Sequence, residues 1–198
     1  MRQIGLCRTL QGVDSKFSDE SDWRDACTGD GSAFGRVFDK HADRLARHAF
    51  RLVPSFADVE DVVAVTFMEA WRRRGAVRFV DGSMLPWLLV TATNSARNIS
   101  RAARRHRALL DRLPPDASTD RAVEDQDDGP AQSALRSLSV PDQQLITLCD
   151  LYGYSATEAA VVLGISGTAV RSRLSRARSR LALAARYEGP HVVIEGES

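Results

Sequence analysis

Arginine and serine side chains are concentrated on one predicted helix near the carboxyl end of this 198-residue chain. A guanidinium group can hold two phosphate oxygens or a guanine edge, and a serine hydroxyl is small enough to approach DNA closely. No carboxylate interrupts the stretch from Gly167 to Arg186. We therefore predict that a DNA major groove is bound by the following side chains of this helix: Arg171, Ser172, Arg173, Ser175, Arg176 and Arg178.

These side chains belong to the second helix of a predicted helix-turn-helix. Ser155 and Glu158 form a capping box that starts a short helix, and Gly164 ends it. Ser166 can then cap the second helix, whose apolar residues recur at helical spacing as Val170, Leu174, Ala177 and Leu181. The arginines could also be a solvated face that binds nothing. The two caps, the glycine stop and the lack of acids together favour DNA binding.

A helix-turn-helix occurs in repressors, activators and polymerase subunits alike, so its role depends on the rest of the chain. The net charge is only +1, but the charges are segregated. Between Trp71 and Arg112 the arginines are opposed only by Asp81 and Asp111, and an acidic segment follows. Two basic blocks separated by an acidic segment predict two surfaces for a polyanion and a connector that avoids it.

The periodicity of apolar residues predicts an all-α fold of two small helical domains joined by a flexible acidic linker, with the helix-turn-helix in the second domain. In the first domain we expect helices at about 32–50, at 57–71 and from 87 into the basic run near 107, with a loop at 75–86. The expected boundaries are a flexible arm at 1–21, a first domain at 22–113, a linker at 114–132, a second domain at 133–186 and a tail at 187–198.

Several function classes find no support in the sequence. Cys7, Cys27 and Cys149 are odd in number and lack the paired spacing of metal ligands, which favours a reducing cytoplasm. No apolar run approaches the roughly 18 residues that span a bilayer, so we expect a soluble, cytoplasmic protein without membrane insertion. We find no nucleophile paired with a base, phosphate-binding loop or metal-ligand cluster, and predict no enzyme, cofactor or metal site.

Three segments, in order along the chain, resemble those of a bacterial RNA polymerase sigma factor of the extracytoplasmic function (ECF) class. Residues 58–71 resemble the core-polymerase-binding motif, residues 86–98 the promoter-melting and minus-ten-reading helix, and residues 140–178 the minus-thirty-five-binding domain. Together with their flanks they cover most of residues 22–186. The resemblance implies a protein without catalytic activity that directs core RNA polymerase to promoters and helps to open them.

The resemblance also implies which residues bind core polymerase. Those at or near the surface that docks on the beta-prime clamp helices would be Asp58, Asp61, Val62, Thr66, Phe67 and Trp71. From the residues alone, the apolar members of this set could equally be ordinary core. Asp58 and Asp61 are one helical turn apart and are expected to be exposed. No histidine at metal-ligand spacing accompanies them.

For promoter opening, the resemblance implies that the helix from Trp87 meets the minus-ten element as its strands separate. Its polar and basic residues are expected to contact base edges and phosphates of the non-template strand: Asn94, Arg97, Asn98, Arg101, Arg104 and Arg105. Many family members carry basic side chains where this chain has Val90 and Thr93. Phosphate binding is therefore assigned to the arginines that follow.

In the family, the loop before this helix captures a flipped base. Here Phe79 could stack on that base, and Asp81 or Ser83 could hydrogen-bond to it. The alternative for Phe79 and Trp87 is packing against neighbouring helices, and for Trp87 this is the favoured expectation.

The implied partners are core RNA polymerase, through its beta-prime clamp helices and beta flap, promoter DNA, and an anti-sigma factor able to mask both domains. A competing hypothesis is a free-standing helix-turn-helix regulator that binds operator DNA as a dimer. Such a regulator needs a ligand pocket or dimer face in its first domain and has no use for a basic helix at 87–107.

Overall fold

The computed structural model describes residues 18–110 and 129–187, and in both ranges the chain forms helices joined by short turns. The first range contains α1 (Asp19–Cys27), α2 (Gly31–Phe50), α3 (Phe56–Arg72), the 3-10 helix η1 (Arg74–Ala76) and α4 (Leu85–Leu110). The second range contains α5 (Pro130–Ser137), α6 (Val140–Leu145), the π-helical segment η2 (Ile146–Leu151), α7 (Ala156–Leu163) and α8 (Gly167–Tyr187). The predicted all-α fold is confirmed, since strand pairing within the described ranges is limited to one isolated bridge, between Val80 and Ser83.

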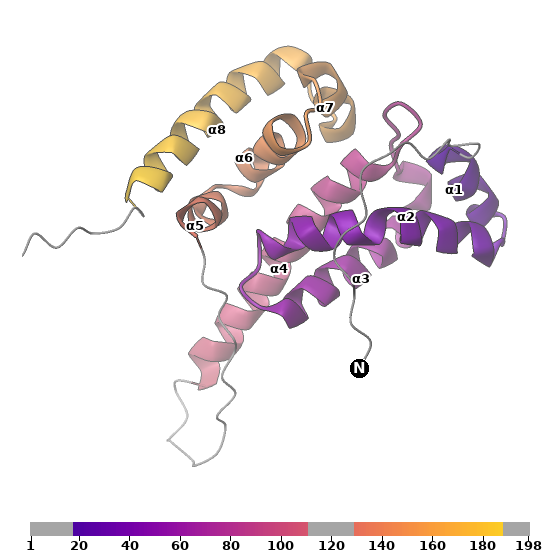
Figure 1. Ribbon diagram of the computed structural model, residues 1–198, viewed down its shortest axis with the longest axis horizontal. Helices are drawn as coiled ribbons and strands as arrows, with labels where there is room; N and C mark the ends of the chain where they lie inside the picture. The colour runs from indigo at the N-terminus through magenta and orange to yellow at the C-terminus, as the bar shows by residue number, and fades with distance from the viewer. Residues whose placement is uncertain (1–17, 111–128, 188–198) are drawn as a thin grey trace, which may run out of the picture.

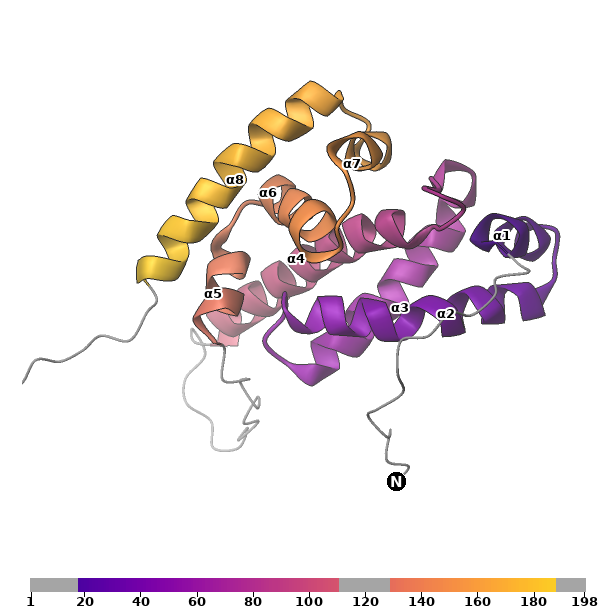
Figure 2. The ribbon, with the colours of Figure 1, turned by 45° about the horizontal axis from the view of Figure 1, so that its top comes forward.

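The helices form two packed units, α1–α4 and α5–α8 (Figure 1). In the first unit, α2, α3 and α4 pack together and bury Leu45, Val62 and Leu88. In the second unit, α8 packs on α5, α6 and α7 and buries Leu174. Helices α6 and α7, with η2 between them, also pack on α4. As a result α8 lies on the far side of the second unit from α4 (Figure 2).

The first helix begins earlier than the sequence predicts. We expected a flexible arm up to residue 21, but α1 begins at Asp19, and Ser18 caps it by accepting a hydrogen bond from the Ser21 N–H. This correction has a tertiary cause. Asp19 is almost completely buried, with 1% of its surface exposed, and it is held by partners far along the chain.

The Asp19 carboxylate joins α1 to α2 and to the turn before α4. One oxygen lies 2.7 Å from His41 Nε2 and accepts hydrogen bonds of 2.9 Å from Ser83 Oγ and the Met84 N–H. The other oxygen lies 2.6 Å from Lys40 Nζ. Burial alone would raise the pKa of Asp19, but hydrogen bonds from His41 and Lys40, with the charge on His41, hold it well below its usual range. Asp19 is therefore a charged, buried anchor.

The second unit also begins earlier than predicted. We expected a linker up to residue 132, but α5 starts at Pro130 with Gly129 at its N-cap. Proline suits a first helical turn because its fixed φ matches the helix and its missing N–H needs no partner there. The rest of the expected linker at 114–128, most of the arm at 1–17 and the tail at 188–198 lie outside the described residues.

A buried histidine near the end of α2 makes the fold sensitive to acid. The His48 Nε2–H donates to the Thr93 hydroxyl at 3.0 Å, because that hydroxyl donates in turn to the Leu89 carbonyl. Burial, with the nearby charge of Arg51, lowers the pKa of His48 to about 3. An unfolded histidine titrates near pH 6.5, so only the unfolded state takes up this proton between about pH 6.5 and 3. The stability that depends on neutral His48 is complete above this window and is lost as the pH falls through it.

We expect this one group to lower the free energy of unfolding by about 1.4 kcal/mol for each pH unit within that window. His48→Gln keeps a donor for Thr93 but cannot take up the proton. The variant should therefore be less stable at neutral pH and show a shallower dependence on pH than the native protein. Urea denaturation at a series of pH values measures how the free energy of unfolding of each protein depends on pH. An equal pH dependence in the variant and the native protein would contradict the role assigned to His48.

Candidate nucleic-acid and protein interfaces

The predicted helix-turn-helix is formed by α7 and α8. The Ser155 N–H donates to Glu158 Oε2 at 2.6 Å, and the Glu158 N–H donates back to Ser155 Oγ at 3.2 Å, which confirms the capping box. Gly164 ends α7 with a φ of +68°, a left-handed conformation that favours glycine. Ser166 Oγ accepts a hydrogen bond of 3.1 Å from the Ala169 N–H and so caps α8. The local sequence signals therefore fix both ends of the turn.

Helix α8 separates an apolar stripe from a basic face. Val170, Leu174 and Ala177 are buried against the unit. All six residues that we predicted to bind a major groove are exposed: Arg171, Ser172, Arg173, Ser175, Arg176 and Arg178. Within the described residues, Arg171 and Arg176 make local contacts of 3.3 Å, to Thr168 Oγ1 and the Ser172 carbonyl. Such contacts within one helix are readily exchanged for phosphate oxygens.

Arg178 differs from the other arginines of this face. Its guanidinium holds the Asp150 carboxylate with contacts of 2.6 to 3.2 Å, and hydrogen bonding to Asp150 raises the pKa of Arg178. Arg180 is paired in the same way with Asp142 at 2.6 Å. Both arginines thus tie α8 to the preceding helices. The DNA contact predicted for Arg178 stays a prediction, and its charge is already partly neutralised by Asp150.

The residues predicted to meet the minus-ten element lie in and beside a hollow between α3 and α4. Asn94, Arg97, Asn98 and Arg101 line it together with the half-buried Trp87. Trp87 packs on the core, as expected, and also borders the hollow. Arg104 lines a neighbouring hollow next to Arg97, and Arg105 is exposed. The arrangement offers amides, guanidinium groups and one aromatic ring to a single ligand.

The loop before α4 contains a two-residue turn. Asp81 and Gly82 both have positive φ, +49° and +73°, and the N–H and carbonyl groups of Val80 and Ser83 pair across them at 2.9 Å. This is the geometry that an Asp-Gly pair favours in a tight hairpin turn. Asp81 is exposed and Phe79 is half-buried. Ser83 is a correction, because its hydroxyl donates to the buried Asp19 and so faces the protein rather than a base.

Helix α3 places only part of its predicted polymerase-binding set on the surface. Asp61 and Trp71 are exposed, and Asp58 is half-buried. Val62, Thr66 and Phe67 are buried against the first unit, with 0%, 0% and 3% of their surface exposed. The Thr66 hydroxyl is also used internally, since it donates to the Val62 carbonyl. Val62 and Thr66 are corrected to core residues, because α2 and α4 pack on the face of α3 that carries them. Phe67 is mostly buried but also lines the apolar hollow between α2 and α3, so its predicted role stays a prediction.

An exposed apolar hollow lies between α2 and α3, and the sequence interpretation named only two of its residues, Phe67 and Trp71. Met68 is the most exposed apolar side chain there at 70%, and Trp71 and Phe38 are exposed to 42% and 38%. The hollow is lined by further apolar residues of α1, α2 and α3. Helical periodicity already places Ala64, Met68 and Trp71 on a face of α3 different from that of Val62 and Thr66. This periodicity could have indicated the hollow from the sequence, but it does not say which face of α3 is exposed.

Comparison with known proteins places these surfaces in a family. Residues 37–106 match the family model Sigma-70 region 2, and residues 129–181 match Sigma-70, region 4. The ECF RNA polymerase sigma factor SigM of Mycobacterium tuberculosis is 32% identical to this chain over 155 residues, which cover 78% of each chain. The chain belongs to the ECF sigma factors.

Further sigma factors resemble the chain to a similar degree. The RNA polymerase sigma factor NccH of Alcaligenes xylosoxydans xylosoxydans is 32% identical over 178 residues, covering 82% of this chain and 92% of NccH. Among solved structures, CnrH in complex with the cytosolic domain of CnrY matches with a TM-score of 0.56 and 29% identity, over 85% of this chain and 97% of CnrH. The sequence comparison and the structure comparison therefore both match this chain to sigma factors.

As a sigma factor, the protein directs RNA polymerase to promoters. Region 2 corresponds to most of α2, with α3 and the larger part of α4, and region 4 corresponds to α5–α7 and most of α8. The alternative of a free-standing operator-binding regulator is not favoured, because such a protein has no use for region 2. Helix α1 precedes the matched segment of region 2.

The remaining features of the described residues of this sigma factor concern membrane-spanning helices, metal ligands and free thiols. None of its helices combines the length and the apolar character needed to cross a membrane. Within residues 18–110 and 129–187, no three His, Cys, Asp or Glu side chains gather as ligands of a metal ion would. Cys27 and Cys149 are free thiols, and burial raises the pKa of Cys149.

Proposed function

We propose that this sigma factor divides its work between three separate surfaces. The apolar hollow beside α3 binds core RNA polymerase at its beta-prime clamp helices, the hollow beside α4 binds the minus-ten element, and α8 binds the minus-thirty-five element. The observation that carries the proposal is the chemical separation of these surfaces. The first is lined mainly by apolar side chains. The second presents arginine and amide groups, and its one carboxylate, Glu69, is paired with Arg72 and Arg73. The third presents arginine with hydroxyl groups.

In region 4, Arg171, Arg173 and Arg176 hold the minus-thirty-five element as duplex. Phosphate contacts position the helix, and one or two bonds to base edges give sequence preference. Ser172 and Ser175 lie between these arginines and leave room for close approach. The beta flap of the polymerase is the proposed protein partner of this region.

In region 2, the non-template strand enters the hollow beside α4 as the duplex opens. Asn94 and Asn98 read base edges, while Arg97 and Arg101 neutralise phosphates along the strand. The turn at Asp81 stands at the end of this helix, where Phe79 can stack on an unpaired base. The Trp87 ring lies beside the bound strand and can contact its bases.

We also propose that the protein carries no catalytic activity and needs no cofactor, and that it acts in the cytoplasm, where the polymerase is found. The matching structures include RpoE of Bartonella quintana in complex with the anti-sigma factor NepR, with a TM-score of 0.50 and 26% identity over 77% of this chain and 96% of RpoE. Together with the CnrH–CnrY complex, this supports an anti-sigma factor as a partner of this chain.

Run-off transcription with purified core polymerase and a library of promoter fragments tests the proposal. Arg171→Ala combined with Arg176→Ala should reduce transcription while leaving core binding intact. Because each phosphate contact contributes about 0.9 to the slope of log affinity against log salt, the slope for minus-thirty-five duplex should become shallower by roughly 2. Arg24→Ala, which removes an exposed arginine of α1, is the matched control. Loss of core binding in the double variant would overturn the assignment of α8.

A further inference from the structure

Region 4 covers part of the surface of region 2 that we assign to the minus-ten element. The Gln144 side-chain amide of α6 donates to Asn94 Oδ1 of α4 at 2.9 Å, so the group proposed to read a base already has a partner. Val140, the first residue of α6, lies at the rim of the same hollow. A DNA strand and region 4 therefore compete for the hollow beside α4.

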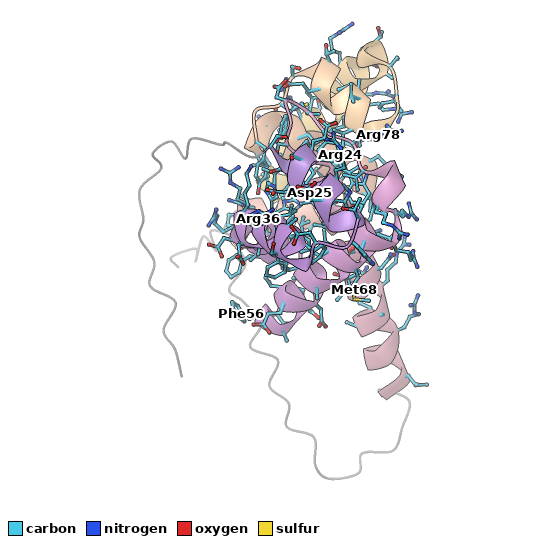
Figure 3. The ribbon with its side chains drawn as sticks, turned by 90° about the vertical axis from the view of Figure 1, so that its right-hand side faces the viewer. Arg24, Asp25, Arg36, Phe56, Met68 and Arg78 are labelled. Atoms are coloured by element: carbon cyan, nitrogen blue, oxygen red, sulfur yellow. The ribbon has the colours of Figure 1, made fainter. Side chains whose placement is uncertain are left out.

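An arginine of region 2 closes the end of a region 4 helix. Arg78 Nη1 donates to the carbonyls of Val161 and Val162, at 2.5 and 3.3 Å, in the last turn of α7. These carbonyls lack partners within a helix and carry its partial negative charge. Gly164 leaves room for the contact, since a Cβ at this position would lie 3.0 Å from Arg78 Nη1. Arg78 is found in Figure 3 where the first unit meets the helices of the second.

A second arginine makes the reciprocal contact. Arg136 of α5 donates from Nη2 to the Val53 carbonyl at 2.7 Å and from Nε to the Arg51 carbonyl at 3.2 Å. Both carbonyls lie just beyond the carboxyl end of α2. Each unit thus supplies a guanidinium to a helix end of the other, and the two contacts lie at different places along the interface.

We propose that Arg78 and Arg136 form a latch that holds the sigma factor closed, with region 4 of the same chain as the partner that masks the minus-ten surface. The masking, though not the latch, rests on the proposed function of Asn94 and its neighbours. The apolar hollow beside α3 includes no residue of α5–α8 in its lining, so it stays accessible in the closed form. Core polymerase can therefore bind first, and strand reading requires the latch to open.

Small-angle X-ray scattering of the full chain tests the latch, with Arg78→Ala combined with Arg136→Ala as the open variant and Arg24→Ala as the matched control. We expect a larger radius of gyration for the double variant alone, with unchanged helical circular dichroism. Arg78→Ala by itself should show the same change to a smaller extent, and it removes only an exposed side chain. A double variant as compact as the native protein, or a native protein already extended, would overturn the latch.

Binding of a single-stranded minus-ten oligonucleotide, taken from a fragment that the holoenzyme transcribes, tests the masking. Because region 4 no longer covers the hollow, the double variant should bind the oligonucleotide about tenfold more tightly than the native protein and the control do. Open scattering with unchanged affinity would overturn the masking. If neither form binds the oligonucleotide while scattering still distinguishes them, the latch is supported and the proposed role of α4 is wrong.

Discussion

Core RNA polymerase is expected to bind the Met68→Glu variant at least about tenfold more weakly than the native protein, because a carboxylate would enter the apolar hollow that we assign to the clamp helices. Met68 is 70% exposed and contributes little to the core, so the change should leave the fold intact. Trp71→Ala should weaken binding in the same direction by removing aromatic contact area. Both affinities can be measured by fluorescence anisotropy with labelled sigma factor and purified core enzyme.

Phe56→Glu provides the matched control for this prediction. Phe56 is also a large apolar residue of α3, 64% exposed, but it does not line the hollow. Figure 3 labels Phe56 and Met68 at separate places on the helix. An equal loss in both variants would show that the whole helix face binds, not the hollow. Unchanged binding of Met68→Glu would remove the hollow from the polymerase interface altogether.

Asp19→Ala is expected to lower the free energy of unfolding by about 3 to 5 kcal/mol at neutral pH, the range found when one partner of a buried ion pair is removed. The substitution leaves His41 buried without its carboxylate and removes the acceptor of Ser83 and of the Met84 N–H. Urea denaturation followed by circular dichroism gives the magnitude.

Asp25→Ala is the control for the loss of an acid from the same helix. Asp25 is exposed near the carboxyl end of α1, where a negative charge gains nothing from the helix dipole. This variant should be as stable as the native protein or slightly more stable. If Asp19→Ala lowered stability by less than about 1 kcal/mol, a value typical of an exposed pair, the anchor role of Asp19 would be wrong.

The helix-turn-helix could be predicted in detail because its determinants are local. Ser155 and Glu158 satisfy each other three residues apart, and Gly164 adopts its left-handed conformation within the same turn. Apolar periodicity similarly located α3 and α4. In these segments, the interactions that set the helix ends join residues that are close together in the sequence.

The errors in the sequence interpretation concern long-range contacts. Asp19 was taken for part of a flexible arm because its partners His41 and Ser83 are 22 and 64 residues away. Val62 and Thr66 share helical spacing with exposed residues, and only the packing of α2 and α4 decides that they face inward.

The contact between regions 2 and 4 could not be predicted for the same reason. Gln144 and Asn94 are 50 residues apart, and Arg78 contacts α7 across 83 residues. Neither pair has a pattern that periodicity or charge counting can detect. Two separated domains on a linker were therefore the natural prediction, whereas the structure has them in contact.

The anchoring of the Asp81 turn by Asp19 means that the family segment and the folding unit have different boundaries. The match to region 2 begins at residue 37, yet the carboxylate that pins Ser83 and Met84 comes from α1, outside that segment. A fragment cut at the family boundary would keep every residue of α4 that we propose to contact the promoter, but would lose the support of the turn that precedes the helix. A region 2 fragment that keeps the support of this turn should therefore start no later than Ser18.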